Sequence, residues 1–368
     1  MRRTEAVAWV LTLGAALRLS QAKTLAALAA AALHVGRVSL ANIGRQLLGP
    51  AAAKHRVKRT WRFCANPRVH VSDAMGGLIR RLCHRRTKKP LVVALDWTDL
   101  RSFHTLMAAA VMKGRALPLL WQTHAGREFH RSQNALEEGL LVLLRALVPR
   151  AVPVVVLADR GFGRTELARA CQRLGLSYAV RIKPDVWVEH RRFTGLLADY
   201  PVQKGIRHVL TGAVYRKDGA VTHNVVIHWK PGLPAKRDHP WYLMTDLGGG
   251  AVKLTRLYGR RMTVEELFRD DKNRRNGMAL RDTQLTRADR IDRLLLILAL
   301  AYWLLVGVGL LARQRFRPGR WCSSNDERQC SAFTIGKVMV DDMQVSAAAA
   351  FRVILEATIE ATAELGTT

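Results

Sequence analysis

The chain has 368 residues, of which 49% are hydrophobic and 24% are charged, and its formal net charge is +30. This composition excludes a disordered chain, because a polypeptide of this length and hydrophobicity can bury a substantial core. The large excess of positive charge indicates a polyanionic partner: DNA, RNA or an anionic membrane surface.

The positive charge is concentrated at the beginning of the chain. Residues 1–90 hold 18 Lys and Arg against only Glu5 and Asp73, whereas residues 313–368 hold 7 residues of each sign. We therefore expect residues 1–90 to bind nucleic acid and residues 313–368 to have a different role. The five cysteines form no C-x2-C pair, which predicts reduced thiols and no structural zinc.

Residues 1–88 follow a helical pattern and form the first predicted region. An alanine-rich helix is expected to reach about Ala32, followed by two shorter helices around a turn at Gly49-Pro50, the first of them capped by Ser39. This pair resembles a DNA-binding helix-turn-helix, and the alternative is a helical hairpin with a solvated basic face. The residues expected to meet phosphates are Lys54, His55, Arg56, Lys58 and Arg59.

From Pro90 the hydrophobic period changes to that of strands alternating with helices. The order of three strands, helix, strand, helix and strand predicts a ribonuclease-H-like core, which is a mixed sheet flanked by helices. In this fold the first three strands meander and the later strands run parallel to the first. The predicted elements are strands at 91–100, 103–112 and 115–125, a helix at 132–147, a strand at 152–159, a helix at 165–175 and a strand at 176–183.

Two aspartates end apolar runs in this core, Asp96 in LVVALDWTDL and Asp159 in VPVVVLADRGFG. We expect both at the carboxyl ends of adjacent central strands, where open sheets of this kind place their sites. The ordinary alternative for each aspartate is a turn or a helix cap. Asp99, the nearest rival of Asp96, is expected to be a surface turn residue.

Residues 185–250 are β-rich and are predicted to be an insertion into the core, ending in three glycines. A long helix is expected to begin after these glycines and to continue to about Asn276, where Gly277 would stop it. Four polar residues in this helix recur at spacings of 3, 4 and 7, which places them on one face over about 21 Å. They are Tyr258, Arg261, Glu265 and Lys272.

These residues predict a metal-dependent site. Carboxylates bind hard divalent cations, and two such ions about 3.5–4 Å apart can activate an attacking oxygen and stabilise a leaving one. We therefore predict Asp96, Asp159 and Glu265 as metal ligands, with Arg261 and Lys272 holding non-reacting phosphates. The alternative for Glu265 is a simple ion pair with a helix neighbour at the i,i+4 spacing.

The uncharged segment 294–312 has the length of a membrane span. Arg293 and Arg313 flank it equally and give no orientation signal, so we predict a buried helix that covers the sheet. The start of the chain imitates a secretory signal, but Glu5 and Arg18 interrupt that pattern. We therefore expect a cytoplasmic protein without a membrane partner.

The chain resembles a bacterial DDE transposase of the insertion-sequence-four type over about residues 37–312. The family hallmark Y-x2-R-x3-E-x6-K is matched by the four residues of the helix stripe. The family's strand ends, D-x-T and D-R-G-F, are matched by Asp96-Trp97-Thr98 and by Asp159-Arg160-Gly161-Phe162.

The resemblance implies cut-and-paste transposition with two Mg²⁺ ions, or Mn²⁺ in their place. The enzyme would nick the element end, form a hairpin and join the element to target DNA. Tyr258, Arg261 and Lys272 would hold DNA phosphates, and a homodimer would bridge the two inverted-repeat ends of double-stranded DNA. Family members also stack a tryptophan of the β insertion on a flipped base, and the candidates are Trp187, Trp229 and Trp241.

Two other functions stay open from the sequence: a ribonuclease-H-like DNA nuclease without strand transfer, and a degenerate DNA-binding relic. The predicted regions are a helical DNA-binding region at 1–88, the first part of the core at 89–184, the β insertion at 185–250, the catalytic and apolar helices at 251–312, and a tail at 313–368 for which we predict dimerisation.

Overall fold

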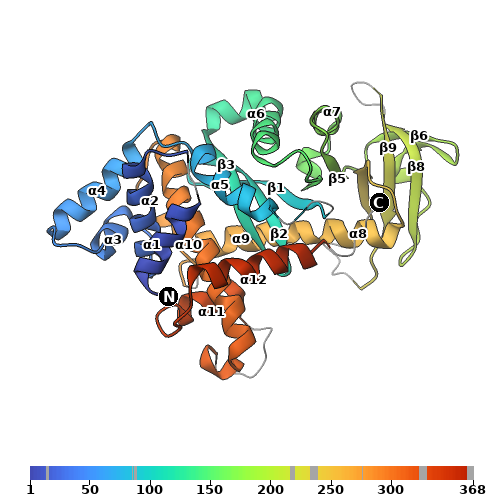
Figure 1. Cartoon of the computed structure of the whole chain (residues 1–368). Coiled ribbons are helices and arrows are strands. Elements are labelled where there is room, and N and C mark those ends of the chain that lie inside the picture. The colour runs from blue at the N-terminus through green and yellow to red at the C-terminus, as the bar shows by residue number, and fades with distance from the viewer. Residues whose placement is uncertain are drawn as a thin grey trace.

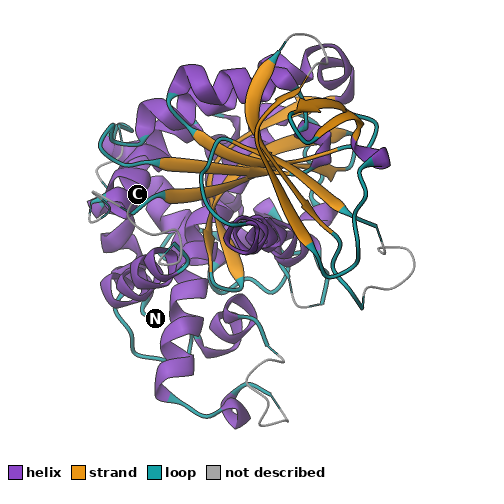
Figure 2. Cartoon of the chain, turned by 90° about the vertical axis from the view of Figure 1, so that its right-hand side faces the viewer, coloured by secondary structure: helices purple, strands orange, loops and turns teal. Residues whose placement is uncertain are grey.

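The computed structural model describes residues 1–13, 16–84, 86, 89–215, 220–232, 239–275, 277–322 and 330–362, without the side chains of 127–131. The molecule is elongated, with the N-terminal helices at one end and a group of β-strands at the other (Figure 1). A twisted sheet runs through the centre, with helices packed on its faces (Figure 2).

In the described residues, ten strands form one mixed sheet in the order β3-β2-β1-β4-β5-β10-β9-β8-β6-β7. The first five strands confirm the predicted strand order: the first three form an antiparallel meander, and the next two continue parallel to β1. The central strand β4 is buried at every position, as a sequence of valine and leucine with helices on both faces requires. The bounds are β1 (Leu91–Leu100), β2 (Phe103–Met112), β3 (Arg115–Ala125), β4 (Val154–Ala158) and β5 (Ser177–Ile182).

The β-rich region extends this sheet. Strand β10 pairs antiparallel with β5, so the five later strands are hydrogen-bonded to the core and form no layer of their own. The predicted β-rich pieces correspond to four of these strands, and β7 was not predicted. The assignment of 185–250 as a separate insertion stays a prediction. The bounds are β6 (Trp187–His190), β7 (Phe193–Leu196), β8 (Arg207–Tyr215), β9 (Val221–His228) and β10 (Trp241–Thr245).

The N-terminal region is helical, as predicted, but the single alanine-rich helix is wrong. It is two helices, α1 and α2, which pack against each other. Folding back buries apolar side chains on both helices, including Val10 and Leu25, which a single straight helix would leave in water. Ser39 caps α3 as predicted, because its hydroxyl accepts a hydrogen bond from the Asn42 amide at 3.0 Å. The bounds are α1 (Arg3–Thr12), α2 (Leu19–Ala32), α3 (Leu40–Gln46), α4 (Ala53–Ala65) and α5 (Val71–Cys83).

Two pairs of helices cover opposite faces of the sheet (Figure 1). One face carries α6 (Gly126–Leu147) and α7 (Thr165–Leu174). The other face carries α8 (Ala251–Gly259) and α9 (Thr263–Lys272), which lie end to end as one rod.

The predicted single helix after the glycines is therefore wrong in two details. A 3₁₀ turn, η4 (Arg260–Met262), separates α8 from α9, and α9 ends at Lys272. The chain folds back there: Gly277 packs on the Asp270 carbonyl so closely that a Cβ atom would lie 2.2 Å from the oxygen. This reversal stops the helix before Asn276, which lies outside the described residues.

The long apolar helix α10 (Ala288–Arg315) lies inside the protein. In the described part of the chain it is the one helix long and apolar enough to cross a membrane, and 94% of its most apolar stretch is buried. This agrees with the predicted core helix. In the described part of the predicted tail, α11 (Ala332–Met339) and α12 (Ala347–Glu360) pack against α10. Gly309 permits the close approach, since a Cβ atom there would lie 1.8 Å from the Ala332 carbonyl oxygen.

Candidate active site

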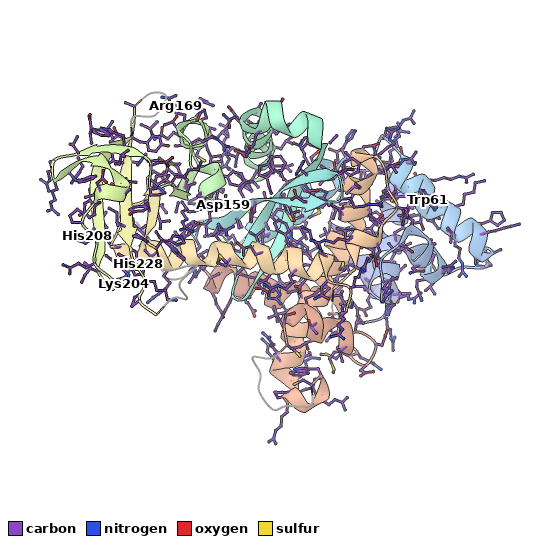
Figure 3. The ribbon with its side chains drawn as sticks, turned by 180° about the vertical axis from the view of Figure 1, so that it is seen from behind. Trp61, Asp159, Arg169, Lys204, His208 and His228 are labelled. Carbon is purple, nitrogen blue, oxygen red and sulfur yellow. The ribbon has the colours of Figure 1, made fainter. Side chains whose placement is uncertain are left out.

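Asp96 and Asp159 lie side by side where strands β1 and β4 stop pairing. The parallel register joins Leu95 to Ala158, and each aspartate is the next residue along its chain. Equivalent positions of parallel neighbours project to the same side of a sheet. Figure 3 shows Asp159 near the centre of the molecule, beside the α8–α9 rod. Asp96 differs from the prediction in one respect, because β1 continues past it to Leu100.

Arg261 connects the first aspartate to the glutamate of the helix. Its Nη1 donates to Asp96 Oδ2 at 3.0 Å, and its Nη2 donates to Glu265 Oε1. The Arg261 residue is only 6% exposed, so this charge is held in place by its two carboxylate partners. The i,i+4 ion pair that the sequence offered as an alternative for Glu265 is therefore present, and Asp96 belongs to the same network.

The pKa of Asp96 is affected by the charges of both other acids. Burial is the main effect and raises the pKa of Asp96 to about 7, while the Arg261 charge opposes that rise. The negative charges of Asp159 and Glu265 raise this pKa further. Asp159 and Glu265 are thus both near enough to Asp96 to act on its charge, and Arg261 only partly offsets the rise in the pKa of Asp96.

A tight loop after β4 orients Asp159. Its Oδ1 accepts a hydrogen bond from the Gly161 amide at 2.8 Å, in a 3₁₀ turn over Arg160–Phe162. The loop also lies against the next strand: a Cβ atom at Gly163 would be 2.6 Å from the Arg181 carbonyl oxygen. The glycines of the D-R-G-F-G run are therefore needed for close packing beside the carboxylate.

Tyr258 and Lys272 lie on either side of the carboxylates. Tyr258 is buried, its pKa is raised by burial to about 12, and the neighbouring charges that act on it are those of Arg261, Arg181 and Asp159. The pKa of Lys272 is lowered, mainly by burial, and Asp96 is among the acids that oppose this shift. Both side chains therefore belong to the electrostatic environment of the site, and their role in holding DNA phosphates stays a prediction.

Arg181 is a further cation at this site that the sequence did not single out. It comes from β5, and its guanidinium lies over the Trp241 ring, 5.6 Å from the ring centroid. Burial lowers the pKa of Arg181, and Tyr258 and Asp159 are the neighbours that oppose this. The apolar run SYAVRI contains a lone arginine, and that is the only sequence signal for it.

Helix α9 is anchored on the side away from the carboxylates. Asp270 pairs with Arg115 of β3 at 2.9 Å and accepts a hydrogen bond from the Tyr302 hydroxyl of α10 at 2.9 Å. On the same side, Glu266 pairs with Arg269, as expected for a residue that points away from the stripe. These contacts fix how Glu265 approaches the sheet.

The carboxylate oxygens of the site suit a hard divalent cation. In the structure, however, an arginine pairs with two of the three carboxylates. In the residues that the structure describes, no three Asp, Glu, His or Cys side chains form a group that could hold a metal ion. The Arg261 guanidinium stands between Asp96 and Glu265 instead. All three acids offer oxygen ligands, which are the ligands that hard divalent cations prefer. The type of donor therefore fits a divalent cation, and the cation pair itself stays a prediction.

A cavity of about 640 Å³ opens next to the loop that carries Asp159. Its walls are aromatic and basic, with Arg160 and Arg181 on the side of the carboxylates. The aromatic residues come from the β-rich region and its connections: Tyr200, Trp229 and Tyr242. A larger cavity of about 950 Å³ is lined by the Glu266 side of α9 and the C-terminal helices, away from the three acids.

Helix α4 exposes a basic face at the end of the molecule. Figure 3 shows Trp61 on this helix, far from Asp159. Arg56 was predicted to meet a DNA phosphate. Its guanidinium instead donates a hydrogen bond at 2.7 Å to the carbonyl of Leu47, the residue after the end of α3. The predicted residues that are exposed are Lys54, His55, Lys58 and Arg59, and Arg62 joins them.

Comparison with known proteins identifies a family. The family model described as "Transposase DDE domain" matches residues 87–304, which is more than half of the chain and includes all six predicted site residues. A search of the curated proteins found no match.

Proposed function

The chain belongs to the family of transposases with a DDE domain, and we propose that it performs cut-and-paste transposition of an insertion sequence with Mg²⁺. In this proposal it is of the insertion-sequence-four type and acts in the cytoplasm on nucleoid DNA. The family match supports a transposase, and the residues around Asp96 support the finer assignment.

One observation carries the proposal. Asp96 and Asp159 follow a matched pair of parallel residues, and Arg261 connects Asp96 to Glu265. Acids from two strands and one helix therefore lie in one region of the molecule, and such carboxylates are the kind of ligand that metal-dependent phosphoryl transfer uses.

We assign the three acids as ligands of a divalent cation pair. When bound, such a pair activates the attacking oxygen and stabilises the leaving oxygen of a phosphoryl transfer. Arg261 would then lose its carboxylate partners and turn its planar guanidinium to a DNA phosphate. Lys272 would hold a second phosphate as a point charge, and Tyr258 would position the DNA strand beside Arg261.

The same residues can serve nicking, hairpin formation and strand transfer in turn, because each step is a transfer of one phosphoryl group at one site. Arg181 lies beside Tyr258 and Asp159 and adds positive charge where a sharply bent DNA strand would pass. We assign it to the phosphates of the hairpin, together with Tyr258, Arg261 and Lys272.

Trp229 is the best of the three candidate tryptophans for stacking on a flipped base. It lines the aromatic cavity beside the Asp159 loop, and the Lys204 ammonium lies 5.1 Å from its ring centroid. Trp241 instead packs edge-on against Tyr258, with ring centroids 5.5 Å apart. Trp187 is 46% exposed on β6, next to the edge strand of the sheet.

The basic face of α4 would bind the inverted-repeat DNA at a distance from the cutting site. A homodimer could then bring two ends together, with one subunit gripping the DNA that the other cuts. We keep the C-terminal helices as the proposed dimerisation region, because their charge is balanced while that of the N-terminal region is not.

The test uses double-stranded DNA with the repeats that flank the coding gene, incubated with the full chain and Mg²⁺. The parent protein is expected to nick the ends and then form hairpins, whereas Glu265→Gln should bind the DNA and do neither. Glu266→Gln is the matched control, because Glu266 points to the other side of α9. Undiminished cleavage by Glu265→Gln would refute the assignment. Nicks without hairpins in the parent would favour a nuclease.

A further inference from the structure

Helix α6 buries an acid that has no role in the site described so far. Glu137 is 1% exposed, although its neighbour Glu138 lies at the surface and pairs with Arg173 of α7 at 2.6 Å. Burying a carboxylate costs free energy unless other groups satisfy it. The partners of Glu137 therefore indicate what the residue is for.

Three side chains satisfy this carboxylate. Its Oε1 accepts hydrogen bonds from Trp97 Nε1 at 2.9 Å and from Gln133 Nε2 at 2.9 Å. Its Oε2 accepts a charged hydrogen bond from Arg164 Nη2. Burial raises the pKa of Glu137, and the Arg164 charge is the largest effect that opposes the rise.

Two of these partners lead directly to the two strand-end aspartates. Trp97 follows Asp96 on β1, and the Trp97 amide donates to Asp96 Oδ1 at 2.9 Å. On the other branch, Arg164 donates through Nη1 to the Gly161 carbonyl. The amide of that same glycine donates to the Asp159 carboxylate at 2.8 Å. Glu137 thus touches both segments that orient the aspartates, from the opposite side of the sheet to α9.

We propose that Glu137 is a positioning residue, which fixes the two strand-end aspartates relative to each other through Trp97 and Arg164. The inference rests on the proposed function, because it takes Asp96 and Asp159 as cation ligands. Groups that hold the ligands of a cation typically change its affinity by about ten- to a hundredfold when they are removed. Glu137 is buried and reaches the two aspartates only through Trp97 and Arg164.

A purely structural role would be to tie α6 to α7. The Glu138–Arg173 pair already makes such a tie on the surface. It therefore provides a control on the same helix, with the same residue type and the same kind of partner.

The experiment titrates Mn²⁺ alone into the full-length protein by calorimetry. Glu137→Gln is expected to bind Mn²⁺ about ten- to a hundredfold more weakly than the parent. Glu138→Gln should match the parent. DNA affinity measured without metal should be the same in all three proteins, because the basic face of α4 is untouched. Equal Mn²⁺ affinity in Glu137→Gln and the parent would overturn the proposal.

Two more variants separate the explanations. Arg164→Gln removes one branch at a side chain that is 28% exposed, so it tests the inference even if Glu137→Gln does not fold. Arg164→Gln should also weaken Mn²⁺ binding. The double variant should lose little more Mn²⁺ affinity than whichever single variant loses more, because both substitutions act through one chain of contacts. Fully additive losses would overturn the proposal.

Asp96→Asn distinguishes this inference from the function on which it rests. If Asp96→Asn weakens Mn²⁺ binding and Glu137→Gln does not, only the positioning role fails. If neither variant weakens it, the cation site itself is wrong, and both proposals fall together.

Discussion

Arg261 spans Asp96 and Glu265, donating to the aspartate at 3.0 Å and to the glutamate from its other terminal nitrogen. This arginine, in the 3₁₀ turn η4, joins strand β1 to helix α9. It compensates part of the negative charge of the acids in the protein without metal, and a pair of divalent cations would supply more positive charge than one guanidinium. The site is therefore held together before any cation or DNA arrives.

Arg261→Lys should lower the rate of DNA cleavage by about a hundredfold, the order found when one preorganised hydrogen-bond donor is removed from an active site. A lysine ammonium cannot bridge two carboxylates or hold a phosphate with a planar fork. Single-turnover cleavage of end-bearing DNA measures the effect. Arg269→Lys is the control, because Arg269 pairs with Glu266 on the outer side of α9. A similar loss in both variants would mean that the position of Arg261 is unimportant.

Cation binding should release a proton near neutral pH. Burial raises the pKa of Asp96 to about 7, so this carboxyl must lose its proton before it can hold a cation. Mn²⁺ affinity should rise from about pH 6 and level off by about pH 8, and calorimetry in buffers of different ionisation enthalpy would count the proton. Affinity that stays flat over this range would contradict the assignment of Asp96.

The same pKa has a consequence for stability without metal. Because the pKa in the folded protein lies above the ordinary value of an aspartate, the contribution of Asp96 is present at acid pH and is lost as the pH rises through about 7. The unfolding temperature of the parent should therefore fall as the pH rises through about 7 in the absence of metal, and the Asp96→Asn variant should lack that fall. Excess Mg²⁺ should reduce the fall by stabilising the parent above pH 7.

Tyr302→Phe should destabilise the fold by about 1–3 kcal/mol, because it leaves the buried Asp270 carboxylate short of a hydrogen bond. Tyr178→Phe is a matched control: the Tyr178 hydroxyl is buried without a hydrogen-bond partner in the described structure, so its removal should be neutral or stabilising. Denaturant unfolding of both variants gives the comparison. Equal destabilisation would mean that the Asp270 contact does not anchor α9.

DNA binding should weaken steeply with salt, and α4 should account for part of that dependence. Lys54, Lys58 and Arg62 are exposed at i, i+4 and i+8, on one face of the helix. Replacing all three by alanine should reduce the slope of log affinity against log salt by about 0.9 for each phosphate that the protein no longer neutralises. Arg352→Ala, exposed on α12, should leave the slope unchanged. An unchanged slope in the triple variant would mean that the DNA-binding surface is not on α4.

The strands and the acids of the site were predictable because their signals are local. Runs such as LVVALDWTDL define β1 and place Asp96 on it, and the i,i+4 spacing lets Arg261 of η4 pair with Glu265 of α9. The buried state of α10 followed from its flanking arginines, although length and composition alone also fit a membrane span.

The parts that were not predicted depend on contacts distant in the sequence. The break between α1 and α2, the end of α9 at Lys272 and the joining of β10 to β5 all arise from packing partners elsewhere in the chain. Glu137 is the clearest case at the site, because nothing in the pair Glu137-Glu138 shows which acid is buried. Arg56 was misassigned because its carbonyl partner lies across a turn.

The most direct test of the central claim is to locate Mn²⁺ by anomalous scattering in crystals of the protein bound to its DNA ends. We predict two ions about 3.5–4 Å apart, contacted by Asp96, Asp159 and Glu265, with Arg261 turned to a phosphate. Ions bound elsewhere, or a site in which any one of the three acids takes no part, would contradict the account.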